Sequence, residues 1–198
     1  MAQIAPESLL ALEVYARERD AFRSRAIAHK KLRTVHAGEH VTLLFEDEQT
    51  IRYLVQELLR IERIFEDEAI RGELRVYNPL IPDGGNWKAT MLIEYPDEAE
   101  RRLRLGELKG IEGRTWVQVE GSARVFAIAD EDLKRESEEK TAAVHFLRFE
   151  LDGGMRQALQ QGAGLTIGVD HPKYRASVAV SREARDSLVG DLVTAGPA

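Results

Sequence analysis

Cysteine is absent from this 198-residue sequence. Without thiolates the chain cannot itself ligate an iron–sulfur cluster, form a thiolate zinc site or carry a redox-active dithiol. Any bound metal would therefore rest on histidine and carboxylate side chains. No apolar run approaches the roughly 20 residues that a membrane-spanning helix needs, and Met1–Leu10 lacks a basic segment followed by an apolar core. We therefore expect a cytoplasmic protein that does not enter the membrane.

What is present is the composition of an ordinary globular protein, with 43% hydrophobic and 31% charged residues. The length suits one domain, which we expect to span residues 1–198, with an N-terminal helical segment at 6–34 and an α+β core at 39–195. Helical periodicity comes first, and period-two alternation dominates later with short helical patterns between the strands. The predicted fold class is α+β: N-terminal helices packed on a mostly antiparallel sheet of about 5–7 strands with helical insertions.

The segment from Arg19 to Arg33 is strongly basic, with six lysines and arginines and one acid, Asp20, in a chain whose net charge is −6. Such an asymmetric distribution can attract phosphate groups or an acidic partner. A solvated helix face folded against the protein's own acidic surface has the same pattern. Because Phe22 is the only aromatic residue in the segment and the whole chain is acidic, we do not expect nucleic-acid binding.

Residues 48–65 have the pattern of an amphipathic helix. Its expected apolar stripe consists of Ile51, Leu54, Val55, Leu58, Ile61 and Phe65. At about 100° per residue, Glu62 falls within this stripe and Gln56 falls opposite it. A carboxylate on a buried stripe has to be paired, hydrogen-bonded, metal-bound or protonated, because burying it alone is too costly. Glu62 is therefore a candidate functional residue.

Three expected strands end in glutamate, at Glu46, Glu94 and Glu150. If these strands are neighbours, the three carboxylates converge at one sheet edge and need a cation, shared protons or a nearby arginine. The alternative is that each glutamate lies on the solvated face of its own strand. In the strand at 144–151, alternation places Arg148 and Glu150 on the same side.

A loop rich in proline, glycine and asparagine follows at residues 78–87, and we expect it to cover a polar pocket between the 48–65 helix and the sheet. Asn86 lies in this loop, and Asp170 begins a predicted turn at Asp170–Pro172. The candidate ligand-binding residues are Arg148, Glu94, Glu150, Asn86 and Asp170.

Histidine and carboxylate side chains would also make a chemically reasonable site for iron, manganese or zinc. The candidate metal ligands are Glu62, His145, His40, Glu46 and His171. The sequence has no HExxH and no closely spaced ligand motif, so this site depends on the fold to bring distant residues together. His145 heads the more apolar face of its strand and can equally be a hydrogen-bonded core residue. Nucleotide-binding glycine motifs and a nucleophile-elbow motif are absent.

Several blocks of sequence resemble one bacterial family: HKKLR (29–33), HVTLLFEDEQTI (40–51), QELLRIERIFE (56–66), YNPLIPDGGNWKATMLIEY (77–95), AIADED (127–132), TAAVHFLRFEL (141–151) and GVDHPKY (168–174). The chain is similar to the family catalogued as domain of unknown function 3501 over nearly its whole length. The resemblance implies that the gene for this chain, like other genes of the family, lies beside genes for a rubrerythrin-like protein and a heterodisulfide-reductase-like iron–sulfur protein. That context implies an accessory role in peroxide defence or thiol-linked electron transfer, by association rather than by chemistry.

Two hypotheses follow from the residues and the resemblance. In the first, the polar pocket holds a divalent metal or a small charged ligand, with Glu62 and His145 facing inward and His40 and Arg148 supporting them. In the second, the protein is a metal-free binding module that docks on a redox partner through the basic 19–33 segment; a homodimer is also possible. Glu62→Gln separates them, because it should abolish metal uptake in the first case and alter only stability in the second.

Overall fold

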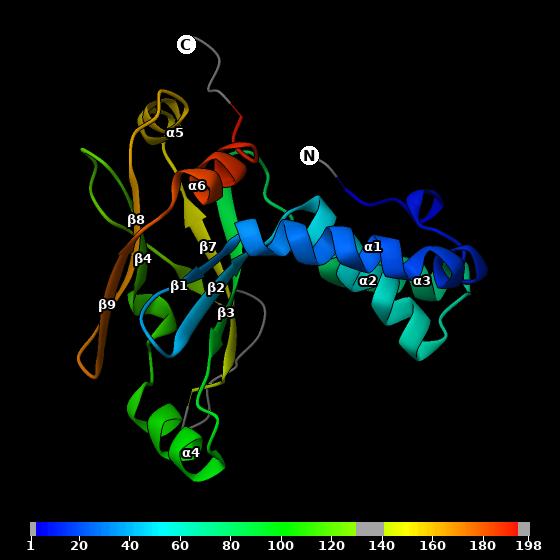
Figure 1. The fold of residues 1–198 in the computed structure, drawn as a ribbon, viewed down its shortest axis with the longest axis horizontal. Helices are drawn as coiled ribbons and strands as arrows, with labels where there is room; N and C mark the ends of the chain where they lie inside the picture. Colours follow the sequence, from blue (N-terminus) through cyan, green and yellow to red (C-terminus); the bar gives the residue numbers. More distant parts are fainter. Residues whose placement is uncertain (1–2, 130–140, 194–198) are drawn as a thin grey trace.

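Two antiparallel β-sheets and a protruding group of helices make up the described part of the chain, residues 3–129 and 141–193 of this computed structural model (Figure 1). The first sheet has the order β1-β2-β3-β7-β6, and the second has the order β5-β4-β8-β9. The strands are β1 (Thr34–His36), β2 (Val41–Phe45), β3 (Asn86–Ile93), β4 (Thr115–Val119), β5 (Val125–Phe126), β6 (Ile128–Ala129), β7 (Val144–Glu150), β8 (Leu165–His171) and β9 (Tyr174–Ala179). The predicted α+β class is confirmed, with the strands divided between two sheets.

Six α-helices and three short 3-10 helices occur in the described ranges. They are η1 (Pro6–Ser8), α1 (Leu12–Leu32), α2 (Glu48–Glu62), α3 (Asp67–Tyr77), η2 (Asn78–Leu80), α4 (Glu98–Glu107), η3 (Glu112–Arg114), α5 (Gly153–Gln160) and α6 (Arg182–Val189). The sequence pattern did not predict α3. The charge run at 130–140, predicted to be a solvated helix or loop, lies outside the described residues.

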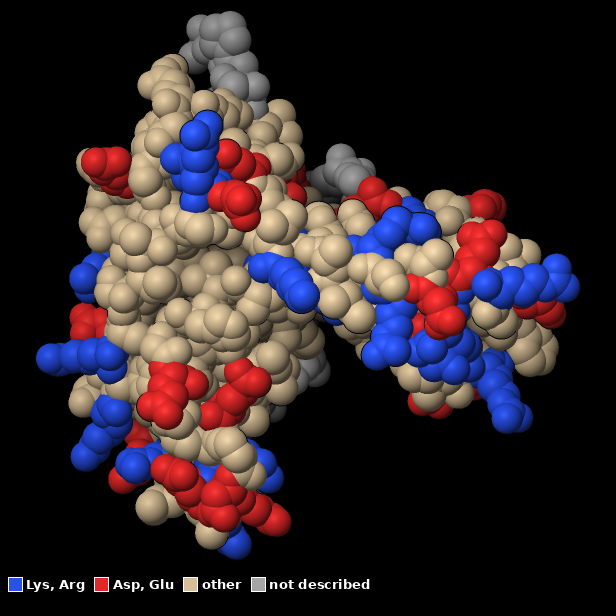
Figure 2. Space-filling model, in the orientation of Figure 1, with Lys and Arg blue, Asp and Glu red and all other residues tan. Residues whose placement is uncertain are grey.

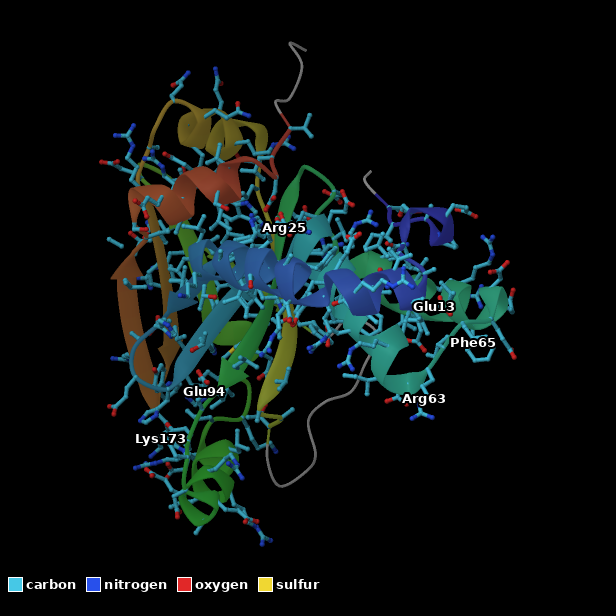
Figure 3. The ribbon with its side chains drawn as sticks, turned by 45° about the vertical axis from the view of Figure 1, so that its right-hand side comes forward. Glu13, Arg25, Arg63, Phe65, Glu94 and Lys173 are labelled. Carbon is cyan, nitrogen blue, oxygen red and sulfur yellow. The ribbon has the colours of Figure 1, made fainter. Side chains whose placement is uncertain are left out.

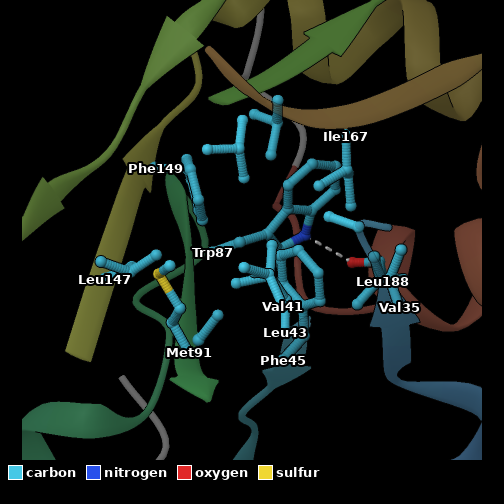
Figure 4. Packing of buried hydrophobic residues seen from close by; sticks show 14 of the residues in the cluster. Val35, Val41, Leu43, Phe45, Trp87, Met91, Leu147, Phe149, Ile167 and Leu188 are labelled. Atoms are coloured by element: carbon cyan, nitrogen blue, oxygen red, sulfur yellow. Dashed lines mark hydrogen bonds between the residues drawn. The ribbon is translucent and has the colours of Figure 1, made fainter. Parts of the chain in front are cut away.

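The larger hydrophobic core lies between the two sheets and beneath α6 (Figure 4). Alternate residues of each strand point into it, as the period-two pattern predicts. Trp87 is fully buried at its centre, with its ring 6.0 Å from that of Phe45 in an edge-to-face arrangement. The indole Nε1 donates a hydrogen bond to the carbonyl oxygen of Leu188 at 2.9 Å. This bond satisfies the one polar atom of the ring and ties α6 to the first sheet.

A second, smaller core holds together the helical lobe, which we define as η1, α1, α2, α3 and η2. Its buried residues are Ile4, Ile51, Val55, Leu59, Leu74 and Ile81. The lobe projects sideways from the sheets, with α1 its longest helix (Figure 1). Only Tyr15 and Ala26 of α1 are buried. This helix therefore contributes little to either core and presents most of its surface to solvent.

The helix α2 begins where predicted and ends before the end of its expected stripe. Asp47 caps it, accepting a hydrogen bond from Thr50 N while Thr50 Oγ1 accepts one from Asp47 N. Arg63 has a left-handed backbone with φ of 55° and ends the helix. The last turn of α2 is less covered than its first three turns, and Glu62 is exposed. Phe65, just beyond the helix, is 72% exposed. The prediction that Glu62 lies on a buried stripe is wrong.

Gln56 lies opposite the stripe, as predicted, but it is buried. It is 1% exposed, and its side-chain amide accepts a hydrogen bond from Leu10 N and donates one to Leu10 O. The chain that leads into α1 therefore covers the side of α2 that was expected to face solvent. None of the helices in the ranges described is both long enough and apolar enough to cross a membrane.

Candidate functional site

Three of the predicted ligand-binding residues meet on the outer face of the first sheet, the face turned away from the large core. Asn86 pairs with Glu150 across β3 and β7, and its Nδ2 donates to Glu150 Oε1 at 3.2 Å. Arg148 forms an ion pair with Glu150 on the same side of β7, as the alternation predicted. Asn86 Nδ2 also donates to Asp83 Oδ2 at 3.0 Å. These contacts fix a polar cluster at the start of β3.

Glu46 lies at this same end of the sheet and is almost completely buried. Its Oε2 accepts a hydrogen bond from Thr50 Oγ1 at 2.5 Å, and its Oε1 accepts one from Thr90 Oγ1 at 2.6 Å. Its backbone N donates to the carbonyl oxygen of Lys88. Two hydroxyl donors thus compensate part of the cost of burying the carboxyl group.

Glu94 does not join Glu46 and Glu150, so the alternative in which all three carboxylates converge does not apply. The strand β3 lies between β2 and β7 and runs antiparallel to both. The ends of β2 and β7 therefore share one edge, whereas the end of β3 lies at the opposite edge. There Glu94 N donates to the carbonyl oxygen of His40, and Glu94 Oε2 accepts from Thr42 Oγ1 at 2.5 Å.

A groove of about 660 Å³ adjoins the polar cluster through Asp83 and Lys88. Its walls are the N-terminal segment, one face of α3 with η2, and the start of the 78–87 loop. Its apolar and amide lining comes from Gln3, Ile4, Ala5, Pro6, Leu74, Asn78, Pro79, Ile81 and Pro82, and its charged lining comes from Glu7, Arg71, Arg75, Asp83 and Lys88. The loop predicted to cover a pocket therefore forms a wall of one, although this pocket lies beside α3 and not between α2 and the sheet.

The loop wall and the N-terminal wall of the groove are held by specific hydrogen bonds. Asn78 Oδ1 accepts from Ile4 N at 3.0 Å and its Nδ2 donates to Ile4 O at 3.1 Å, which pins the N-terminal segment in an extended form. Gly84, at φ of 94°, turns the loop. Its carbonyl oxygen accepts hydrogen bonds from Arg156 Nη1 at 3.3 Å and Val193 N at 2.9 Å. The groove is therefore already formed without a ligand.

His145 is a core residue. It is fully buried on the inner face of β7, and its Nε2 lies 2.8 Å from Thr141 Oγ1 and 3.0 Å from Ala142 O. Glu112 Oε2 is 3.7 Å from the same nitrogen. The structure therefore has the alternative arrangement, in which His145 is a hydrogen-bonded core residue.

His40 and His171 each have their own hydrogen-bond partners, which differ from those of His145. His40 stacks on Tyr95 with ring centroids 4.0 Å apart, and its Nδ1 lies 3.0 Å from Glu94 O. His171 accepts from Lys173 N at Nδ1, which leaves Nε2 to donate to Lys109 O at 3.0 Å. Over the residues described, no three histidine or carboxylate side chains gather as a metal-binding group.

Asp170 is half exposed on the outer face of the second sheet, far in the topology from the polar cluster. Its carboxylate lies 3.7 Å from Arg124 Nη1 and 3.4 Å from Arg175 Nε. The Arg124 guanidinium in turn stacks on Trp116 at 4.0 Å from the ring centroid. Asp170 therefore does not share a site with Asn86, Arg148 and Glu150.

A buried charge network that the sequence did not indicate joins the helical lobe to the sheets. Arg33 is 1% exposed. Its Nε donates to Phe45 O at 3.0 Å, and its Nη1 donates to Ser187 O at 3.2 Å. Its Nη2 donates to Asp191 Oδ2. Burial raises the pKa of Asp191 to about 6, although the Arg33 charge opposes this shift.

A second ion-pair network joins α1 to α2 and is centred on Glu57. Its Oε1 accepts hydrogen bonds from Tyr15 Oη at 2.6 Å and Arg19 Nε at 2.8 Å, and its Oε2 accepts one from Arg60 Nη2 at 3.0 Å. Burial alone would raise the pKa of Glu57, but these three donors outweigh it and lower the pKa to about 2. Arg19, counted in the basic segment, is thus engaged within the chain.

Comparisons with known proteins agree with the architecture described above. The sequence profile of the family described as "Protein of unknown function (DUF3501)" matches residues 3–192. A crystal structure at 1.90 Å, titled a novel protein of unknown function from Burkholderia pseudomallei K96243, is 51% identical, with a TM-score of 0.92. The alignment covers 97% of this chain and all of that one. No curated protein matches the sequence. The chain belongs to the DUF3501 family.

Proposed function

We propose that this protein binds a small molecule that carries an anionic group on an apolar body, in the groove between the N-terminal segment and α3. The observation that carries the proposal is the combination of an apolar lining, including Ile4 and Leu74, with three cationic side chains in one preformed groove. Pockets of this size, largely apolar with a few placed polar groups, are the usual sites of small ligands.

The two arginines of the groove, Arg71 and Arg75, are available to an anion. Arg71 and Arg75 are one turn apart on α3, so their side chains lie on the same face. Their ion pairs, with Glu7 at 3.3 Å and Glu68 at 3.2 Å, join exposed side chains. Such exposed pairs contribute about 0–1 kcal/mol, so a ligand carboxylate or phosphate can replace them at little cost.

The acids of the groove weaken this attraction only in part. The carboxylate of Asp83 accepts hydrogen bonds from Gly85 N at 2.8 Å and from Asn86 Nδ2 at 3.0 Å. Glu7 is the partner of Arg71. The lining therefore has three cations and two carboxylates, of which Asp83 is held by donors of its own loop. Lys88 Nζ donates to Pro79 O, and Glu68, outside the lining, pairs with Arg75. The balance favours an anion over a cation.

A role of this protein beside peroxide-defence or iron–sulfur redox systems stays a prediction from the family resemblance. A metal bound by the predicted histidine and glutamate residues likewise stays a prediction. Groove binding requires neither, and it agrees with the first hypothesis in its form of a small charged ligand near the 78–87 loop.

Calorimetric titration with octanoate tests the proposal, because octanoate joins a carboxylate to a hydrocarbon chain. Hexylammonium and inorganic phosphate are the control probes, since each lacks one of the two features. We expect Arg71→Gln with Arg75→Gln to weaken octanoate binding about tenfold, at about 0.7 kcal/mol for each exposed ion pair lost. Arg102→Gln with Arg182→Gln, exposed arginines outside the groove, is the matched control. Equal binding by both double variants, or no octanoate binding, would rule the proposal out.

A further inference from the structure

We propose that two copies of this chain associate through their helical lobes, with the basic half of α1 in each copy contacting the turn between α2 and α3 in the other. The observation is that the lobe carries two exposed patches of opposite charge, each with exposed apolar side chains. The residues of this surface do not line the ligand groove, although Glu68 pairs with Arg75 of the groove.

The first patch, the basic patch, is on the second half of α1. Between Ala21 and Arg33 this segment has five lysines and arginines and no acid. Arg23 and Lys31 are exposed and lie one turn to either side of Ile27, which is 43% exposed on the same face of α1. Arg25 is exposed on the opposite side of the helix. Arg23 and Lys31 form no ion pair with any residue that the structure describes. The charges of Arg23 and Lys31 are therefore not neutralised by an ion pair within the described chain, whereas Arg33 is buried and paired with Asp191.

The second patch, the acidic turn, covers residues 61–68 at the tip of the lobe. It has four acids, Glu62, Glu66, Asp67 and Glu68, against one arginine, Arg63. Glu62, Glu66 and Asp67 have no ion-pair partner in the described ranges.

The acidic turn also exposes the largest apolar side chains of the lobe. Phe65 is 72% exposed and Ile61 is 61% exposed. Exposed apolar groups of this size, surrounded by charge, are typical of a surface that contacts another molecule.

The two patches lie too far apart to neutralise each other within one chain. Tyr15 bonds Glu57 and the Phe22 ring stacks with the Tyr53 ring at 6.3 Å, so α2 runs antiparallel to α1. Ile61, one turn beyond Glu57, therefore lies beside the start of α1. Ile27 is some 15 residues further along α1, a separation of about 20 Å at 1.5 Å per residue. Figure 3 shows this separation, with Arg25 near the sheets and Phe65 at the far end.

A second copy supplies the complement of both patches at once. If two lobes lie side by side in opposite directions, each basic patch meets the acidic turn of the other copy, and a two-fold axis relates the two contacts. The lobe stands clear of the sheets, and positive and negative side chains crowd its surface whereas much of the sheet face is uncharged (Figure 2). Charge complementarity of this kind fixes orientation, and the apolar residues provide the buried contact.

Sedimentation velocity over a concentration series, at low salt and at about 0.5 M salt, tests the association. We expect a dimer that dissociates more readily at high salt. Arg23→Glu with Lys31→Glu, and separately Glu66→Lys with Asp67→Lys, should each weaken the homodimer at least tenfold. The two variants mixed together should form a dimer, because each then offers the charge that the other needs. Phe65→Ser should weaken the dimer, whereas Leu103→Ser, at an apolar residue of α4 that is 62% exposed, should not.

Circular dichroism of each variant establishes that it is folded, since all the substituted side chains are exposed. Wild-type protein that stays monomeric up to about 1 mM would overturn the proposal, because an association weaker than about 4 kcal/mol is not specific. A dimer that both charge-reversed variants retain, or a mixture of the two that stays monomeric, would overturn it as well.

Discussion

Arg33, at the end of α1, and Asp191, just beyond α6, form a buried ion pair between residues 158 positions apart in the sequence. Asp47 lies 3.5 Å from the same guanidinium, and His29 Nε2 lies 2.5 Å from Asp47 Oδ2. One arginine thus serves two carboxylates where the helical lobe meets the sheets. Because Arg33 also donates to the carbonyl oxygens of Phe45 and Glu46, its removal would leave several buried acceptors unsatisfied.

Asp191→Asn should change how stability depends on pH. The pKa of Asp191 is about 6 in the folded chain, above its ordinary value of 3.8. The folded state therefore binds the proton more tightly, and stability falls as pH rises from about 4 to about 6. Two pKa units correspond to at most about 3 kcal/mol. We expect Asp191→Asn, which keeps an acceptor for Arg33, to abolish this fall and to be more stable than wild type at pH 8.

Urea unfolding between pH 4 and pH 8 measures this effect. Asp191→Ala is the matched control, because it removes the acceptor as well as the charge and should be less stable than Asp191→Asn at every pH. A wild-type stability that rises across the window would contradict the raised pKa.

Glu57→Gln should act in the opposite sense. The pKa of Glu57 is lowered from 4.5 to about 2, so its stabilising contribution is complete above pH 4.5 and is lost as pH falls toward 2. We expect the substitution to cost about 2–3 kcal/mol at pH 7 and to flatten the acid limb of the stability profile. Glu48→Gln on the same helix removes an exposed i,i+4 pair with Arg52 and should cost less than about 0.5 kcal/mol. Thermal unfolding of the wild type and the two variants at pH 7 and pH 3 measures these differences. Equal losses of stability for both variants would contradict the role of Glu57.

Gly168→Ala should destabilise the second sheet. An added Cβ would lie 2.4 Å from Trp116 Cζ2 and 2.5 Å from the backbone oxygen of Ala176. The strand β9 would have to move, because a carbonyl in the ladder cannot rotate away, and we expect a cost of about 2–3 kcal/mol. Gly113→Ala is the control, since nothing lies within 4 Å of its added Cβ. Chemical denaturation followed by tryptophan fluorescence measures both, and a silent Gly168→Ala would contradict the close approach of the Trp116 ring.

The parts of the fold that the sequence predicted are those that a local pattern determines. The strands β2, β3 and β7 alternate because each buries one face, so period-two alternation located them. The position of Arg33 depends on α6, more than 150 residues away, and no local pattern reports such a contact. Within the basic run Arg33 has the same appearance as Lys31, although one is buried and the other exposed.

The candidate site shows the same division between local and distant information. Alternation placed Arg148 and Glu150 together correctly, because both lie on one strand. The convergence of Glu94 with Glu46 stayed an open alternative, because it depended on the strand order and direction. The groove was predicted only in part. Its loop wall has a strong turn composition, but α3 opposite was not predicted, although Ile70, Leu74 and Tyr77 recur at helical spacing in Asp67–Tyr77.

Glu62→Gln should leave both stability and metal content unchanged, which separates the structure from the sequence-based pocket hypothesis. Glu62 is exposed beside the left-handed Arg63, so its replacement removes no buried charge and should change stability by less than about 0.5 kcal/mol. His145→Ala should cost about 2–4 kcal/mol, because it opens a cavity and leaves Thr141 without its 2.8 Å partner. Thermal unfolding and mass spectrometry of metals, on protein purified without chelator, measure both properties. Stoichiometric metal that Glu62→Gln removes would restore the predicted metal site and would require α2 to turn its last residues inward.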